Sequence, residues 1–280
     1  MTQPMNSNPF AGATEKAQAL REQFATLPES VIHGVIGARG ASGGKGGKET
    51  MWNLNVELVA WRVADGPLQD SELKISKRVT DEELKRLQQL LRSETLVAIS
   101  AKLCEHSPFG DARAQLGEVL APPDDAALSA KLAAYIQPVE MHDPLLGKLV
   151  LNKAVNWFDG KATWLGQEVR FSVEPDDDNS PAPALQTAKS LWEAAGEWDE
   201  KARRYAAGEM LENKNENWLE EGEAELTIEQ FMANMRLNSI TFGPDGNVDF
   251  WFDDGDMFWG HAITVSGSLA EGFTDASIAG

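Results

Sequence analysis

The sequence contains a single cysteine, Cys104, among its 280 residues. One cysteine excludes an internal disulfide bond and any zinc site built from several thiolates. Long apolar runs are also absent, because no stretch approaches the ~18 residues that a membrane-spanning helix needs. Residues 1–24 lack the basic segment followed by an apolar segment that marks a secretory signal. We therefore expect a cytoplasmic protein with no membrane partner.

Basic residues are scarce relative to acidic ones, with 25 Lys and Arg against 44 Asp and Glu and a net charge of −19 at pH 7. The imbalance is concentrated after residue 140, where 10 basic side chains stand against 26 acidic ones. Such a surface repels phosphate backbones, so we expect no binding to nucleic acid. It suits a basic protein partner, or it serves solubility alone.

Several sequence signatures of catalytic and cofactor sites are missing. The chain has no serine elbow, no cysteine–histidine signature and no dinucleotide-binding glycine pattern. Residues 37–49 are rich in glycine and lysine, but neither Gly-Lys pair is followed by the Ser or Thr that a phosphate loop requires. We expect a flexible hairpin connection in this segment, with an anion-binding loop as the alternative.

Chain length and the order of expected elements predict an α+β protein with two small domains. Residues 1–27 are small and polar, and we expect a flexible, loosely docked leader with one possible short helix. Residues 28–138 contain several expected strands and two helices, and form the first small α+β domain. Residues 139–280 run from strands to helices and back to strands, and form a second, acidic α+β domain. In each domain we expect an antiparallel sheet with covering helices.

Local signals place the elements of the second domain. Three strands are expected between residues 149 and 173, with Asp159-Gly160 as a hairpin turn. Ser180-Pro181 is expected to open a helix, and residues 213–217 indicate a turn. Thr227 and Gln230 are spaced as a capping box, which predicts another helix start.

The most informative stretch covers residues 247–267. Val248, Phe250 and Phe252 alternate with polar residues or Trp, which is the period of a strand with two unlike faces. Asp254-Gly255 then predicts a tight hairpin turn, because glycine adopts positive φ without steric cost. We expect the return strand to start at Met257 and residues 239–242 to form a third adjacent antiparallel strand.

The same hairpin holds the candidate catalytic residues Asp253, Asp256 and His261. Asp253, Asp254 and Asp256 are also candidate metal ligands, because carboxylates with an imidazole can bind a divalent metal and activate water. The turn alone accounts for Asp254-Gly255, however, and His261 shares its expected face with apolar side chains. We therefore expect no metal or other cofactor and lean against an enzyme.

Trp251, Trp259, Asp249 and Asp254 are candidate binding residues, because Trp is common where proteins bind partners. The favoured hypothesis is a non-catalytic acidic module that binds a basic protein, as an immunity or toxin-neutralising protein does. One alternative is a metal-dependent hydrolase that uses the acidic hairpin from Asp253 to His261. Another is a small-molecule binding module lined by Trp.

Residues 147–280 contain long, Trp-rich segments, among them LGKLVLNKAVNWFDGKATWLGQEVRFSV, ENKNENWLE, LTIEQFMANMRLNSITFGPDGNVDFWFDDGDMFWGHAITVSG and ASIAG. This half of the chain resembles a bacterial family catalogued as Domain of Unknown Function 2262. The resemblance implies a bacterial cytoplasmic protein with no established activity. It implies no assigned catalytic residues.

Overall fold

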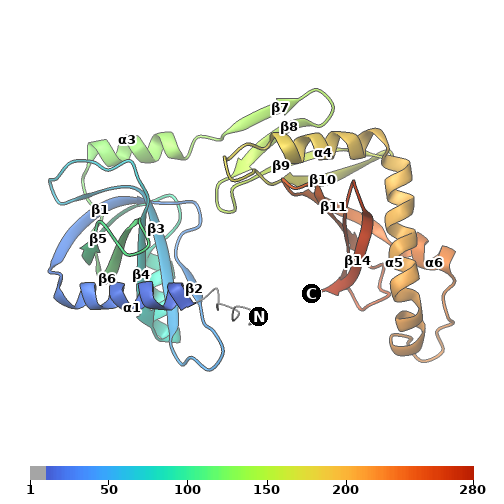
Figure 1. Ribbon diagram of the computed structural model, residues 1–280, viewed down its shortest axis with the longest axis horizontal. Helices are drawn as coiled ribbons and strands as arrows, with labels where there is room; N and C mark the ends of the chain where they lie inside the picture. The colour runs from blue at the N-terminus through green and yellow to red at the C-terminus, as the bar shows by residue number, and fades with distance from the viewer. Residues whose placement is uncertain (1–10) are drawn as a thin grey trace, which may run out of the picture. The chain divides into compact units, whose positions relative to one another are not determined.

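The computed structural model describes residues 11–280 (Figure 1). The chain divides into two compact units, Met1–Gln137 and Pro138–Gly280. Each unit contains one sheet accompanied by helices, so the predicted α+β class with two sheet-based domains is confirmed. No helix within residues 11–280 is both long and apolar enough to cross a membrane.

The sheet of the first unit closes on itself. Its strands pair in the order β1-β5-β6-β4-β3-β2, and β1 also pairs with β3, which completes a ring of five strands. Only β4 and β6 run parallel. This ring order is the Greek-key arrangement of an OB-fold barrel. The strands are β1 (Glu29–Ile36), β2 (Ser42–Gly44), β3 (Trp52–Val63), β4 (Leu73–Val79), β5 (Leu96–Cys104) and β6 (Ala112–Leu120).

Two helices of the first unit begin at side-chain caps. At α2 (Asp81–Leu90), the Thr80 hydroxyl accepts a hydrogen bond from the Glu83 N–H, and buried leucines of the helix join the barrel core. At α3 (Ala126–Tyr135), the Asp125 carboxylate accepts hydrogen bonds from the second and third helical N–H groups. An oxygen at this position satisfies N–H groups that have no partner within the helix.

The third helix of this unit, α1 (Ala11–Thr26), lies where the sequence predicts a possible short helix within the leader of residues 1–27. Leu20 and Phe24 are buried against Cys104 of β5. Residues four apart lie on the same face of a helix, so two large apolar side chains are enough to anchor this one. Residues 1–10 of the expected leader lie outside the described residues.

The sheet of the second unit has eight strands in sequence order. All neighbours are antiparallel except β10 and β11, which run parallel. A parallel pair needs a long crossover connection, and three helices lie within it. The strands are β7 (Glu140–Asp143), β8 (Gly147–Asn152), β9 (Trp157–Trp164), β10 (Gln167–Val173), β11 (Arg236–Phe242), β12 (Asn247–Asp253), β13 (Ala262–Ser268) and β14 (Gly272–Ala279).

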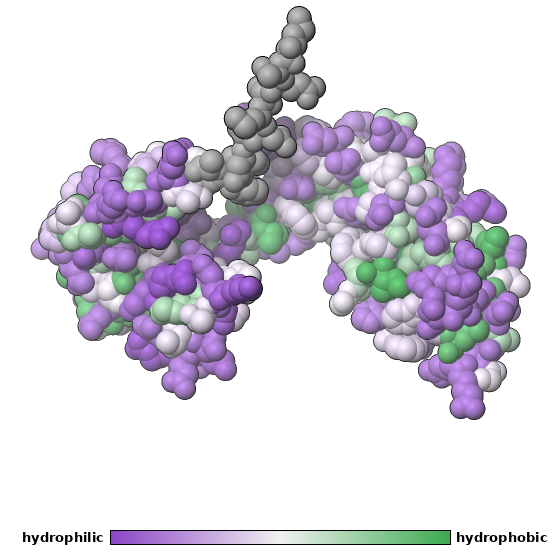
Figure 2. Space-filling model, turned by 60° about the horizontal axis from the view of Figure 1, so that its bottom comes forward, coloured by the Kyte–Doolittle hydropathy of each residue, from purple (hydrophilic) through white to green (hydrophobic). Residues whose placement is uncertain are grey.

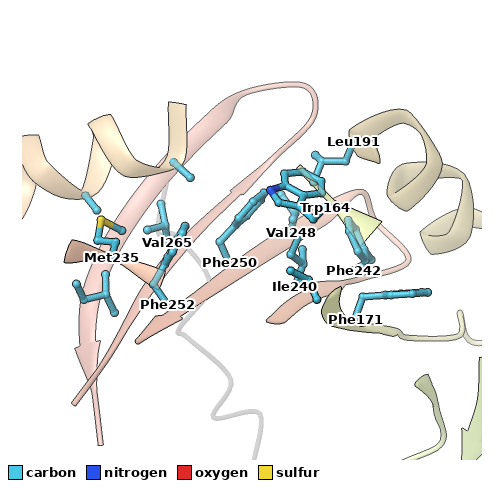
Figure 3. Packing of buried hydrophobic residues seen from close by; sticks show 14 of the residues in the cluster. Trp164, Phe171, Leu191, Met235, Ile240, Phe242, Val248, Phe250, Phe252 and Val265 are labelled. Atoms are coloured by element: carbon cyan, nitrogen blue, oxygen red, sulfur yellow. The ribbon is translucent and has the colours of Figure 1, made fainter. Parts of the chain in front are cut away.

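The crossover helices are α4 (Ala182–Glu193), α5 (Ala195–Asn217) and α6 (Ile228–Asn234), and α4 and α5 lie along one side of this sheet (Figure 1). Phe250 and Phe252 of β12 are fully buried on the helix side, in one cluster with Trp164 of β9 and Phe171 of β10 (Figure 3). Trp251 lies between these two phenylalanines in the strand and is exposed. The predicted alternation of this strand is therefore present, and one face of the sheet is buried while the other carries polar side chains.

Several local expectations for the second unit can now be judged. The capping box at Thr227 and Gln230 is confirmed in both of its hydrogen bonds. Strands β11, β12 and β13 are adjacent and antiparallel, as predicted. The turn expected at Asp159-Gly160 is wrong, because both residues lie inside β9. The turn expected at residues 213–217 is also wrong, because α5 continues through them to Asn217.

The tight hairpin expected at Asp254-Gly255 is longer than predicted. Strand β12 ends at Asp253 and β13 begins at Ala262, and these two residues pair directly. Met257, Trp259 and His261 therefore lie in the connection and not in the return strand. The reason is the fold of this connection, which is described next.

Candidate partner-binding cleft

The connection between β12 and β13, residues 254–261, is organised by one buried carboxylate. Asp254 is only 3% exposed. Its Oδ1 accepts a hydrogen bond from the Asp256 N–H at 3.1 Å, and its Oδ2 accepts from the N–H groups of Phe258 at 2.6 Å and Gly260 at 3.1 Å. A charged acceptor with three amide donors fixes a loop more strongly than neutral pairs would. Asp254 is thus a structural residue of this connection.

The backbone of this connection is strained as well as ordered. Gly255, Asp256, Trp259 and Gly260 all have positive φ, at 58°, 68°, 58° and 85°. Positive φ is rare for a bulky residue such as Trp, and it persists only where the surroundings impose it. Gly255 is also required by space, because a Cβ there would lie 2.5 Å from the carbonyl oxygen of Asn234.

The strained connection forms one wall of a cleft of about 730 Å³. The other wall comes from the end of α6 and from the segment between α5 and α6. Among the described residues that line the cleft, three are acidic and none is basic. The lining residues are Glu220, Glu223, Asn234, Gly255, Asp256, Met257 and Trp259.

A buried lysine holds the opposite wall in place. Lys214, near the end of α5, is 1% exposed. Its Nζ donates to both carboxylate oxygens of Glu223 at 3.0 Å and to the carbonyl oxygen of Trp218 at 2.9 Å. The pKa of Glu223 is lowered by the N–H of Glu220 and by this ammonium group. Glu223 therefore carries a stable negative charge that Lys214 neutralises, while Glu220 and Asp256 leave the cleft acidic.

Trp259 is the exposed aromatic residue of the cleft, with 64% of its surface accessible. Its ring lies 4.7 Å from the ring of Trp218, at an interplanar angle of 60°. Trp218 in turn packs edge-on against the buried Phe258 at 5.4 Å. An aromatic ring supported in this way, next to carboxylates, is suited to receive a cationic group.

The structure separates the candidate residues of the hairpin into different environments. Asp256 and Trp259 line the cleft. Asp253 accepts a hydrogen bond from Asn238 Nδ2 at 3.0 Å, and Asp249 accepts one from the Ser266 hydroxyl. Since Trp251 stands between these two aspartates in β12, all three belong to the exposed face of the sheet.

His261 lies against a ring and not among carboxylates. Its imidazole is half-buried, 6.1 Å from the ring of Trp218 in an edge-on arrangement. Across residues 11–280, no three His, Cys, Asp or Glu side chains are grouped so that they could hold a metal ion. The candidate ligands Asp253, Asp254 and Asp256 accordingly do not form a cluster.

Sequence reasoning missed the wall opposite the hairpin. The glutamates at 220 and 223 belong to an acidic run that is visible in the sequence, but nothing in that run indicates which residues of the chain it faces. Lys214 sits among polar residues, so its burial has no sequence signal. The ion pair between Lys214 and Glu223 requires the full length of α5, which continues through the turn predicted at residues 213–217.

Comparison with known families gives two matches. Residues 143–278 match a family described as "Uncharacterized protein conserved in bacteria (DUF2262)", which confirms the resemblance for this half of the chain. Residues 16–135 match a second family, described as "Domain of unknown function (DUF7021)". No curated protein matches the chain.

Proposed function

Starting from a chain whose two halves match families of unknown function, we propose that it is a non-catalytic binding protein. The acidic second unit docks a basic protein partner, and the cleft at Trp259 receives a Lys or Arg side chain of that partner. An immunity or toxin-neutralising protein would act in this manner. The observation that carries the proposal is an exposed, conformationally fixed Trp beside Glu220 and Asp256, in a cleft with no basic residue among its described lining residues.

The chemistry of the cleft favours a cation. A guanidinium or ammonium group over a Trp ring contributes about 0.5–2 kcal/mol, depending on how far it is desolvated. Glu220 and Asp256 add charge-assisted hydrogen bonds to the same group. Because the backbone and Trp218 already fix Trp259, little conformational entropy is lost when the partner binds.

The charge of the whole second unit supports the same partner. Residues 138–280 contain 10 Lys and Arg against 27 Asp and Glu. A field of this sign attracts basic proteins over several ångströms and speeds their association at low salt. It also disfavours nucleic acid as the partner of this unit. We place this function in the cytoplasm, as the sequence leads us to expect.

The test compares two exposed tryptophans of the same unit. Purified basic products of neighbouring genes are titrated, one at a time, against the protein and against Trp259→Ala, with calorimetry as the readout. We expect one of them to bind with a Kd that rises by roughly tenfold or more in Trp259→Ala, as at an interface hot spot. The affinity should fall as salt is raised.

The matched control is Trp251→Ala, because Trp251 is 37% exposed but lies on the sheet face outside the cleft. This variant should bind as the unchanged protein does. The cleft is not the docking site if both variants lose the same amount of binding affinity. The same conclusion follows if the partner's affinity changes neither with salt nor in Trp259→Ala.

A further inference from the structure

The first unit contains a second cavity, of about 280 Å³, on the outer surface of its barrel. It lies over β3, β4 and β6 and is bordered by the segment that follows β1. Polar and basic side chains dominate its lining. The lining residues are Arg39, Gly40, Ser42, Asn55, Val56, Glu57, Lys74, Ile75, Ser76 and Arg113.

The pairing of the strands brings these side chains together. Glu57 of β3 pairs with Lys74 of β4, and Lys74 pairs with Arg113 of β6, so three charged residues form one row across the sheet. Asn55 and Ser76 form the next row two residues along, on the same face. Val56 lies between Asn55 and Glu57 in β3, so its side chain points to the other face of the sheet, where it is buried in the barrel core. The strand period therefore produces a polar outer surface over an apolar interior.

Backbone contacts position the part of the 37–49 connection that borders the cavity, residues 37–41. The Gly37 N–H donates to the Glu57 carbonyl at 2.9 Å, and the Ala41 N–H donates to the Leu91 carbonyl at 3.0 Å. Gly40 has φ +62°, and a Cβ there would lie 2.9 Å from the Ser93 nitrogen. Arg39 is thus held at the cavity by backbone contacts on both sides of it.

Basic side chains outnumber acidic side chains in the lining of the cavity. Lys74 and Arg113 share a single carboxylate, that of Asp111, at 3.1 Å from Nζ and 2.6 Å from Nε. Burial raises the pKa of Glu57, and its hydrogen bond with Glu72 raises it further. Among the described residues that line the cavity, Glu57 is the one carboxylate, beside the three cations Arg39, Lys74 and Arg113.

We propose that this cavity binds the phosphate group of a small phosphorylated molecule. Guanidinium groups match phosphate oxygens with paired N–H donors, and the ammonium group of Lys74 adds a third cation. Hydroxyls of Ser42 and Ser76 line the same space. The volume lies near the lower end of the ~300–1,000 Å³ typical of ligand pockets, which suits a small ligand.

A small ligand is favoured over a nucleic-acid strand by the charge of the first unit. Residues 1–137 are close to neutral, with 15 Lys and Arg against 17 Asp and Glu. Each further phosphate of a strand needs another basic side chain to neutralise it, and this unit has no excess of basic residues to supply one.

The experiment uses the full chain and three probes, namely inorganic phosphate, adenosine monophosphate and a thymidine oligonucleotide. Titration calorimetry at fixed ionic strength should show saturable binding of adenosine monophosphate, with phosphate as a weaker competitor. Arg39→Ala and Lys74→Ala should each raise the Kd by about tenfold. Arg78→Ala is the matched control, because Arg78 is on β4 but pairs with Glu49 and does not line the cavity.

Thermal unfolding of each variant shows whether weaker binding results from a damaged site or from an unfolded protein. If Arg39→Ala does not fold, Lys74→Ala still tests the site independently. No saturable binding of phosphate or adenosine monophosphate overturns the proposal. So does an equal loss in Arg78→Ala, which would indicate unspecific charge attraction. Tighter binding of the oligonucleotide through several nucleotides would overturn the small ligand in favour of a strand.

Discussion

At the scale of single residues, Asp254 shows how a carboxylate proposed as a metal ligand can instead have a purely structural role. Its two oxygens accept three backbone hydrogen bonds from its own connection. Those bonds hold Asp256 and Trp259 at positive φ. The carboxylate therefore determines where the cleft residues lie without facing the cleft itself.

We predict that Asp254→Ala destabilises the protein by about 2–4 kcal/mol, because three amide donors, of which that of Phe258 is buried, lose a charged acceptor. Urea unfolding followed by circular dichroism measures this loss. The control is Asp253→Ala, which removes an exposed carboxylate of the preceding residue and should change stability by only about 0.5 kcal/mol. Similar losses in the two variants would contradict the structural role of Asp254.

The sequence could indicate the turn at Asp254-Gly255 but not its length. An Asp-Gly pair between two segments of alternating apolar and polar residues predicts a two-residue hairpin. Nothing in this pattern indicates that Trp259 lies in the connection and not in the return strand. That information lies in contacts with Asn234 and Trp218, which are distant in sequence. The roles of residues that depend on such distant contacts cannot be predicted from the local sequence pattern.

At the scale of elements, the glycine in strand β9 is needed for close packing of the core and does not form a turn. Gly160 lies in the middle of the strand, and a Cβ there would lie 2.6 Å from the ring of Phe171. The buried ring of Phe171 occupies the space that a side chain would need. Asp159, by contrast, accepts a hydrogen bond from the Ser172 hydroxyl on the opposite face.

We expect Gly160→Ala to destabilise the protein by about 1–3 kcal/mol through overpacking of the core. The matched substitution is Gly208→Ala in α5, where a Cβ meets nothing within 4 Å. There alanine should stabilise the protein by about 0.5–1 kcal/mol, because glycine is unfavourable inside a helix. Differential scanning calorimetry of both variants gives the two signs, and a gain from Gly160→Ala would refute this account of the strand.

Elements were predictable where local chemistry decides them. The capped helix start at Thr227 follows from a hydroxyl placed three residues before an amide side chain. The two parallel pairings, β4 with β6 and β10 with β11, did not follow, because they join segments separated by whole helices. Strand order of this kind depends on tertiary packing.

At the scale of the whole molecule, each unit has a core of its own. The cluster of the first barrel and that of the second sheet share no residue within the described chain. Hydrophilic residues cover most of the surface on the face that Figure 2 shows, and apolar patches are small and separate. The boundary between the two units lies between Gln137 and Pro138.

We therefore predict that residues 1–137 and residues 138–280 fold as separate fragments. Each should unfold cooperatively in urea, because each retains its complete sheet and its covering helices. A cut at residue 180, inside the crossover of the second sheet, is the control, since it divides one core between two pieces. Failure of either fragment to fold alone would show that the units depend on each other.

The crossover between β10 and β11 has a consequence for synthesis on the ribosome. When β10 emerges from the ribosome, β11 has not yet been synthesised, because α4, α5 and α6 lie between the two strands in the sequence. One edge of the nascent meander therefore remains without its hydrogen-bonding partner until residues 236–242 have been made. An open strand edge can pair with other chains, so the time during which this edge is exposed to aggregation is set by the translation of α4, α5 and α6.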